Sequence, residues 1–214
     1  VNRSGTASQR ITVKPVAGQT VIIDGQGNRE DLIDVPNSYV NVSGFEVRNS
    51  KAFCVNLIGQ NTTVSGLTVH DCQDHGIYSE GQHIVIEGNT VYLSNLENQS
   101  RNASSGWGSA IKLRVGADDV VIQNNTVYHN DGEGIAATRA TNVTIRDNRV
   151  YDNFAVNIYV DNSHDVVVER NFITCEDDTT ARGFYRDGHS AHAIALAEEQ
   201  YDGWGAQLRN VTVK

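Results

Sequence analysis

The sequence has no long apolar run and few basic residues, and both shortages exclude a class of protein. No stretch approaches the ~18 consecutive apolar residues that a transmembrane helix needs, so we expect no membrane span. Only 17 lysines and arginines stand against 26 aspartates and glutamates, a net charge of −9. A nucleic-acid-binding surface is expected to carry a basic stripe, so nucleic acid is not an expected partner.

Cysteine is also scarce, with Cys54, Cys72 and Cys175 as the three residues. They do not form a disulfide framework, and in the repeat register given below none of them stacks directly on another. We therefore expect buried or corner thiols. If one disulfide exists, Cys54 to Cys72 is the candidate pair.

The strongest positive signal is a repeat within the stretch from Asp119 to Asp165. Two copies of 23 residues follow each other without insertion, DVVIQNNTVYHNDGEGIAATRAT and NVTIRDNRVYDNFAVNIYVDNSH. Each copy holds three short apolar stretches with period two, separated by Asn, Asp and Gly, and none is long enough for a helix. Such a unit cannot bury its apolar face alone, so copies must stack at a spacing of about 4.8 Å. The pattern predicts an all-β fold, a parallel β-helix.

The repeat extends over the whole chain. One inward apolar position recurs in seven coils, at Val42, Val64, Ile86, Ile122, Ile145, Val168 and Val213. Another predicted interior row holds Ile77, Ile111, Ile135, Ile158 and Ile194. The corner Asn residues tolerate left-handed backbone angles, and we expect them to bond to the Asn of the next coil as a ladder.

The domain prediction is a single β-helix over residues 1–214, with about 22–23 residues per coil. Two coils carry insertions, near residues 95–108 and 176–190. A solenoid needs polar caps and neither end offers one. We therefore expect a fragment without end caps, with neighbouring coils or domains of a longer chain as partners.

Several segments resemble a known group of proteins. "GEGIAATRATNVTIRDNRVYDN", "NIYVDNSHDVVVERN" and "ITVKPVAGQTVIIDGQG" are similar to the right-handed β-helix repeats of the pectate-lyase-like superfamily, especially its bacterial secreted members. The resemblance implies a secreted or cell-surface protein that acts on or binds polysaccharide. The superfamily includes lyases, glycoside hydrolases, epimerases and proteins without known catalysis, so the fold does not select the activity.

The catalytic residues of two lyase branches do not carry over. "SAIKLRVG" resembles a strand of calcium-dependent pectate lyases, but Trp107, Gly132 and Ile135 stand about where that branch has calcium-binding carboxylates. "GEGIAATR" resembles a motif of the alginate lyase and chondroitinase B family, yet only Glu133 matches and Arg139 is out of step. No cofactor is assigned, and calcium remains a candidate.

The insertions predict where a site lies. Both leave the solenoid at the same corner, three coils apart, so their loops should stand about 14 Å from each other with a groove between them. The groove floor is an outward column, Asp34, Asn56, Tyr78, Lys112, Ala136, Tyr159 and Ala195, and a second one, Glu80, Arg114, Thr138, Asp161 and Ala197. Small residues between cations and an aromatic suit a polysaccharide; the alternative is weak cross-strand pairing on a solvated surface.

The loops supply further candidates for substrate binding. These are Trp107 in the first insertion, beside Arg101, and Arg182, Tyr185, Arg186 and His189 in the second, with His192 at its foot. An exposed Trp or Tyr stacks on sugar rings, whereas Trp107 could equally pin its loop to the coil. Two histidines without a third ligand are weak evidence for a metal. Asp118-Asp119 and Asp177-Asp178 fit calcium or plain turn chemistry.

Three functions stay open at this point. The first is a lyase on uronate polymers, in which Lys112, Tyr159 or a loop histidine takes the proton and Arg114, Arg182 or Arg186 neutralises the carboxylate. The second is a glycoside hydrolase, for which Asp131, Glu133 and Asp161 are the available carboxyl groups. The third is a non-catalytic carbohydrate-binding or structural module. A column of Tyr92, Tyr128 and Tyr151 on another face is expected only to pack on itself.

Overall fold

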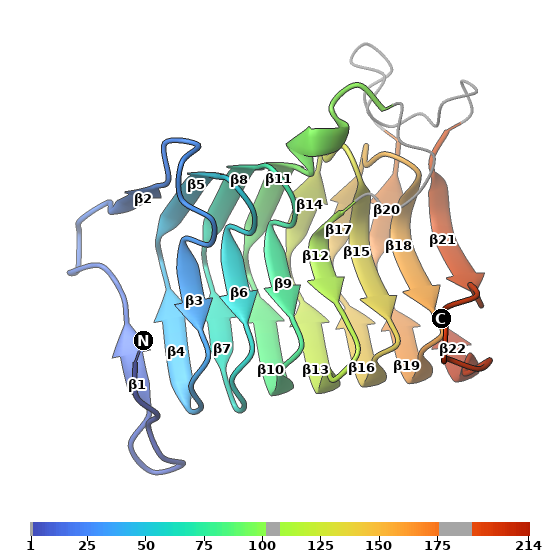
Figure 1. The fold of residues 1–214 in the computed structure, drawn as a ribbon, viewed down its shortest axis with the longest axis horizontal. Coiled ribbons are helices and arrows are strands. Elements are labelled where there is room, and N and C mark those ends of the chain that lie inside the picture. The colour runs from blue at the N-terminus through green and yellow to red at the C-terminus, as the bar shows by residue number, and fades with distance from the viewer. Residues whose placement is uncertain (1, 102–107, 176–189) are drawn as a thin grey trace.

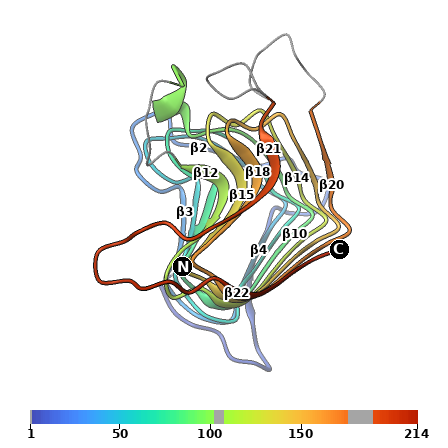
Figure 2. The ribbon, with the colours of Figure 1, turned by 90° about the vertical axis from the view of Figure 1, so that its right-hand side faces the viewer.

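The computed structural model describes residues 2–101, 108–175 and 190–214, in which the chain winds into a stack of coils (Figure 1). Each coil contributes strands to three parallel sheets, as the repeat predicts. Seen end-on, the sheets enclose one apolar column (Figure 2). The prediction of a parallel β-helix is therefore confirmed.

The first sheet contains β1 (Ile11–Val13), β4 (Val40–Ser43), β7 (Thr63–Ser65), β10 (Gln82–Glu87), β13 (Asp118–Gln123), β16 (Thr141–Arg146), β19 (His164–Glu169) and β22 (Arg209–Val213). The second contains β2 (Ile22–Asp24), β5 (Glu46–Ser50), β8 (Thr68–Cys72), β11 (Thr90–Ser94), β14 (Thr126–Tyr128), β17 (Arg149–Tyr151) and β20 (Phe172–Thr174). The third contains β3 (Ile33–Val35), β6 (Val55–Leu57), β9 (Ile77–Ser79), β12 (Ser109–Leu113), β15 (Glu133–Thr138), β18 (Val156–Asp161) and β21 (His192–Ala197). A short 3₁₀ helix, η1 (Leu96–Asn98), follows β11.

The strand register confirms both predicted interior rows. In the first sheet the seven predicted valines and isoleucines pair coil to coil, from Val42 with Val64 to Val168 with Val213. In the third sheet Ile77, Ile111, Ile135, Ile158 and Ile194 pair in the same way. The first four of these isoleucines have no solvent exposure. Burial of this column supplies the main free energy that holds the coils together.

The Asn ladder exists, at the corner between the first and second sheets. Asn125 donates from both its backbone and side-chain nitrogens to Asn148 Oδ1, at 2.9 and 3.0 Å. Asn148 makes the same two bonds to Asn171. The left-handed residue is the one before each ladder Asn, such as Asn124 or Asp147, and not the ladder Asn itself. We expected one Asn to adopt the left-handed backbone conformation and also to bond to the next coil. In the structure two successive residues of the turn do these separately.

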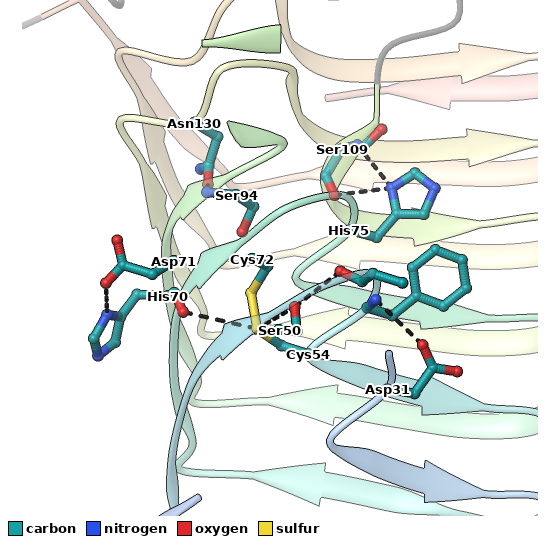
Figure 3. Close-up of a disulfide and its surroundings, with 12 residues drawn as sticks. Asp31, Ser50, Cys54, His70, Asp71, Cys72, His75, Ser94, Ser109 and Asn130 are labelled. Carbon is teal, nitrogen blue, oxygen red and sulfur yellow. Dashed lines mark hydrogen bonds and ion pairs between the residues drawn. A yellow bond between two sulfur atoms is a disulfide. The ribbon is translucent and has the colours of Figure 1, made fainter. Parts of the chain in front are cut away.

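The expectation of free thiols is wrong for two of the three cysteines. Cys54 and Cys72 form a disulfide with a Cα–Cα distance of 5.7 Å (Figure 3). Cys72 lies in register above Ser50, and Ser50 Oγ is 3.4 Å from Cys54 Sγ. This is the pair that the sequence named as the candidate; the bond runs diagonally across a corner, from the end of β8 to the residue before β6, so the two residues do not share a column. Cys175 is exposed.

Both insertions connect the second sheet to the third, as predicted, because one joins β11 to β12 and the other joins β20 to β21. In the third sheet β15 and β18 lie between β12 and β21, so the insertions are three coils apart. The part of the chain that the structure describes holds no helix of the length and apolar character needed to cross a membrane.

Ile135→Ala should lower the free energy of unfolding by about 2–5 kcal/mol, because it opens a cavity between Ile111 and Ile158. Thr144→Ala, on the outward face of β16, should change it by less than about 0.5 kcal/mol. Denaturant unfolding measures both. Equal losses in the two variants would show that the inward and outward assignments are wrong.

Replacing both Cys54 and Cys72 with Ala should lower the free energy of unfolding by about 2–4 kcal/mol, since the bridge closes a loop in the unfolded chain. Chemical denaturation with and without a reducing agent is the measurement. The reducing agent should destabilise the parent and leave the double variant unchanged. A parent insensitive to complete reduction would contradict this.

Candidate functional site

The predicted outward column of the third sheet is present in register. Asp34, Asn56, Tyr78, Lys112, Ala136, Tyr159 and Ala195 pair in succession along the sheet. Thr138, Asp161 and Ala197 of the second column pair likewise. The repeat therefore placed these side chains correctly relative to one another.

The predicted open floor, however, is not open. Ala136 and Asp161 have no solvent exposure, Thr138 has 3% and Lys112 has 8%. The turn with Phe154, Ala155 and Val156 packs on Tyr159 and Ala195 of the first column, and the segment 198–208 bonds to Asp161 of the second. A side chain that points out of a solenoid strand is therefore not in solvent when non-repeating chain lies over the sheet.

Lys112 and Glu133 face each other across neighbouring coils. Lys112 Nζ is 3.6 Å from Glu133 Oε2, and Ser109 Oγ donates to the same oxygen at 2.7 Å. Burial raises the pKa of Glu133, and the charge of Lys112 and the bond from Ser109 oppose that rise. Lys112 thus serves as the counter-charge of a buried carboxyl group, rather than as a free amine.

Asp74, which the sequence analysis did not single out, lies at the corner before β9. Its Oδ1 is 3.5 Å from His75 Nδ1. A Cβ added at Gly108 would come within 2.4 Å of the same oxygen, so the glycine allows the close approach of β12. Burial raises the pKa of Asp74 to about 6, Glu97 adds to the rise, and Lys112 and Arg114 oppose it. Asp74 can therefore exchange a proton near neutral pH.

His75 is a buried neutral imidazole beside Asp74. Its Nδ1 lies 2.9 Å from the backbone nitrogen and 3.2 Å from the carbonyl oxygen of Ser109 (Figure 3). Burial and the charge of Lys112 lower its pKa to about 3. The ring stacks on Tyr78, with centroids 5.3 Å apart, and Phe53 stacks on Tyr78 at 4.6 Å. These rings form an aromatic wall next to the charged groups.

Arg114 brings a cation without a carboxylate partner among the residues that the structure describes. Its Nε is buried and has no hydrogen-bond partner there. Its charge acts on the carboxyl of Asp74 and on the phenol of Tyr78. We call Asp74, His75, Ser109, Lys112, Arg114 and Glu133 the Asp74 cluster. It combines a carboxyl group of near-neutral pKa with a guanidinium that is available to an anion.

Tyr159 and Asp161, the other two predicted catalytic residues, bind the segment 198–208 between β21 and β22. The Tyr159 hydroxyl donates to Glu199 Oε1 at 2.6 Å. Asp161 accepts from the Tyr201 hydroxyl and from the Glu199 backbone N–H. Burial and the bond to Glu199 raise the pKa of Tyr159. In this arrangement both side chains anchor a segment that the sequence analysis treated only as a linker.

Most of the predicted loop residues, Trp107, Arg182, Tyr185, Arg186 and His189, lie outside the described residues. His192 is exposed at the start of β21, and its backbone N–H donates to Ala155 O at 2.9 Å. It pairs with Val156 of β18, so it lies two strands along the sheet from Glu133 of β15. Arg101 instead faces Asp131, with Nε 3.3 Å from Oδ1.

Within residues 2–101, 108–175 and 190–214, no three His, Cys, Asp or Glu side chains gather in a way that could hold a metal ion. Asp118 accepts from Asn142, and Asp119 contacts His83. The other candidate calcium ligands, Asp177 and Asp178, lie in the undescribed segment. A calcium site therefore stays a prediction.

The tyrosine column on the second sheet packs on itself, as expected. Ring centroids are 5.2 Å apart from Tyr92 to Tyr128 and 5.0 Å apart from Tyr128 to Tyr151. His70 extends the stack at 4.7 Å from Tyr92. Since neighbouring rings cover each other's faces, the column offers only ring edges and is poorly suited to stack on a sugar.

Comparison with known proteins agrees with the fold. The family model described as "Right handed beta helix region" matches residues 32–195. No curated protein matches the sequence. Among solved structures, the enzymatically active domain of tailspike protein 2 of bacteriophage CBA120 superposes with a TM-score of 0.61 at 13% identity, covering 86% of this chain and 26% of that one.

A second similar structure is the pectate lyase Pel9A. It has a TM-score of 0.55 at 15% identity and covers 100% of this chain and 63% of its own. The chain thus spans about a quarter of the tailspike domain and less than two thirds of the pectate lyase. Likeness at such low identity extends to the fold and no further.

Asp74→Asn should raise the melting temperature at neutral pH. The pKa of the Asp74 carboxyl group is about 6 in the folded chain, and the ordinary pKa of an aspartate, which we take for the unfolded chain, is 3.8. Its contribution to stability is therefore full below pH 3.8 and is lost as pH rises through about 6. The gain from the neutral amide should shrink as pH falls from 6 toward 3.8 in thermal melts.

Asp147→Asn is the matched control, because the hydrogen bond from Arg170 lowers the pKa of that exposed carboxyl. Its contribution is present above the unfolded pKa, so this variant should lose a little stability at neutral pH. If both variants change in the same direction, Asp74 is not a destabilising carboxylate.

Proposed function

The chain belongs to the family of proteins with a right-handed β-helix region, and we propose that within it this protein is a secreted or cell-surface polysaccharide lyase that acts on uronate-containing polymers. One observation carries this proposal. The charge of Arg114, whose Nε has no partner among the described residues, acts on Asp74, whose pKa is about 6. A cation for a substrate carboxylate and a nearby base are the two groups that β-elimination requires.

The chemistry assigns one role to each group. Arg114 binds the uronate carboxylate and neutralises it, which makes the hydrogen on the adjacent ring carbon more acidic. The Asp74 carboxylate takes that proton. The electron pair of the C–H bond then forms the ring double bond, and the glycosidic C–O bond breaks with its electrons on the departing sugar oxygen, which takes a proton from water. The contact with Glu133 fixes the position of the Lys112 ammonium group in the cluster.

The solved structures support a carbohydrate substrate by analogy. One of them is a pectate lyase, and another is the enzymatically active domain of a phage tailspike. The buried Cys54–Cys72 disulfide supports a protein that works outside the cytosol, since such bonds persist in oxidising compartments. Both arguments are independent of the Asp74 cluster.

A glycoside hydrolase is the second candidate, because two carboxyl groups of raised pKa, Asp74 and Glu133, occur in one cluster. Hydrolysis needs one acid and one base or nucleophile. Glu133 is 7% exposed and is bonded to Ser109. The lyase uses only the more accessible of the two carboxyl groups, and for that reason we favour it.

The test is turnover of pectate, alginate and neutral glycans, with and without added calcium. Unsaturated products are followed by ultraviolet absorbance and new chain ends by a reducing-sugar assay. We expect unsaturated products from a polyuronate, with kcat/KM rising as pH passes through about 6 and Asp74 loses its proton. Asp74→Asn and Arg114→Ala should each reduce kcat/KM by about 100-fold or more.

Arg170→Ala is the control, since this exposed cation pairs with Asp147 at the corner between the first and second sheets. It should leave turnover unchanged. New reducing ends without unsaturated products would contradict the lyase proposal and show that the protein is a glycoside hydrolase. Glycan binding without any cleavage would overturn catalysis and leave the binding module that the sequence also allows.

A further inference from the structure

A pocket lies at the corner between the third and first sheets, whereas Asp74 and His75 lie at the opposite edge of the third sheet, before β9. Its volume is about 500 Å³, within the range of small-ligand sites. Turns after β12, β15 and β18 form one side, and the segment 203–207 forms the other. None of its lining residues belongs to the Asp74 cluster.

The segment 198–208 is fixed at its base and open at its tip. At the base, Tyr201 donates to Asp161, and Asn162 Nδ2 donates to the Glu199 carbonyl at 2.7 Å. At the tip, a Cβ added to Gly203 or to Gly205 would meet nothing within 4 Å. The tip between these two glycines carries Trp204, whose backbone N–H donates to Tyr201 O at 3.0 Å, and it has open space around it.

Three residues that line the pocket carry buried polar atoms without hydrogen-bond partners among the described residues. These atoms are Arg139 Nε, Trp204 Nε1 and Asn162 Oδ1. Asn162 as a whole is 1% exposed. A buried polar atom left unpaired costs about 1–3 kcal/mol, and native structures contain few of them. Finding three around one cavity indicates a place where a ligand completes the bonding.

Arg139 is held in position and is also unpaired. Its guanidinium carbon lies 4.4 Å from the ring centroid of Tyr201 and 5.6 Å from that of Trp204. No carboxylate pairs with it in the described part of the chain. The planar guanidinium presents donors that match the two oxygens of a carboxylate. Asp118 also borders the pocket, but its Oδ1 already accepts from Asn142 at 2.8 Å.

The unpaired atoms specify the chemistry of the ligand. Two donors, on Arg139 and Trp204, call for acceptor oxygens such as those of a carboxylate. The acceptor on Asn162 calls for a hydroxyl donor. The indole ring supplies an apolar face for a sugar ring. We propose that this pocket binds one acidic sugar residue, a hexuronate, at a site separate from the Asp74 cluster.

These atoms have almost no solvent access in the structure, so the ligand reaches them when the Trp204 tip shifts. The inference does not require catalysis by the Asp74 cluster, because no residue is shared between the two sites. It does specify that binding forms a new hydrogen bond from the Trp204 indole N–H. That bond gives the site a spectroscopic signature of its own.

The test is a titration of the full chain with galacturonate, followed by the indole N–H resonances in ¹H–¹⁵N NMR. The chain has two tryptophans, and Trp204→Phe assigns the signal. We expect the Trp204 signal to shift saturably with galacturonate. Galactose has a hydroxymethyl group in place of the carboxylate. Its affinity should be lower by about 10-fold or more, the usual loss for a charged hydrogen bond.

Arg139→Ala should weaken galacturonate binding by about 10-fold or more, for the same reason. Arg146→Ala is the matched control, because Arg146 bonds to Gln123 on the outward face of the first sheet. Asp74→Asn should bind like the parent, which separates this site from the proposed lyase. An unshifted Trp204 signal, equal binding of galactose, or full binding by a folded Arg139→Ala variant would overturn the pocket assignment.

Discussion

Backbone pairing between successive coils, in one unbroken register, is the constraint on which the other features depend. Each strand of a coil pairs with the equivalent strands above and below, so identical positions stack in columns. Any cluster of side chains must then be assembled from adjacent coils. The pair of Lys112 and Glu133 follows this rule, because their strands β12 and β15 are neighbours in the third sheet.

The corners add specificity that the apolar column lacks. Interior valines and isoleucines would pack almost as well if the coils slipped, since the interior is similar in every coil. An Asn that bonds to the Asn of the next coil and to a backbone carbonyl penalises such slippage, because a buried amide would lose its partners. The same corners carry the residues with left-handed backbone angles, at Asn124, Asp147 and Arg170. The repeat thus encodes its own register.

Sequence reasoning therefore reached the repetitive part of the structure and little beyond it. The interior rows, the outward columns and the connection of both insertions between the same sheets follow from the period alone. Asp74 and His75 were missed because they lie at a corner, where alternation no longer says which way a side chain points. The contacts that cover Asp161 and Tyr159, and the pocket at Trp204, depend on non-repeating segments that fold over the sheet. A periodic pattern contains no information about such segments.

Three coil steps separate the strands that follow the two insertions, β12 and β21. Because every step has the same height of about 4.8 Å, the number of coils without insertions between them sets the distance between the two connections. Gain or loss of one whole repeat in evolution would move the two connections apart or together by one step while leaving each corner intact. A solenoid can in this way match its working surface to longer or shorter polymers by duplication, without redesigning any contact within a coil.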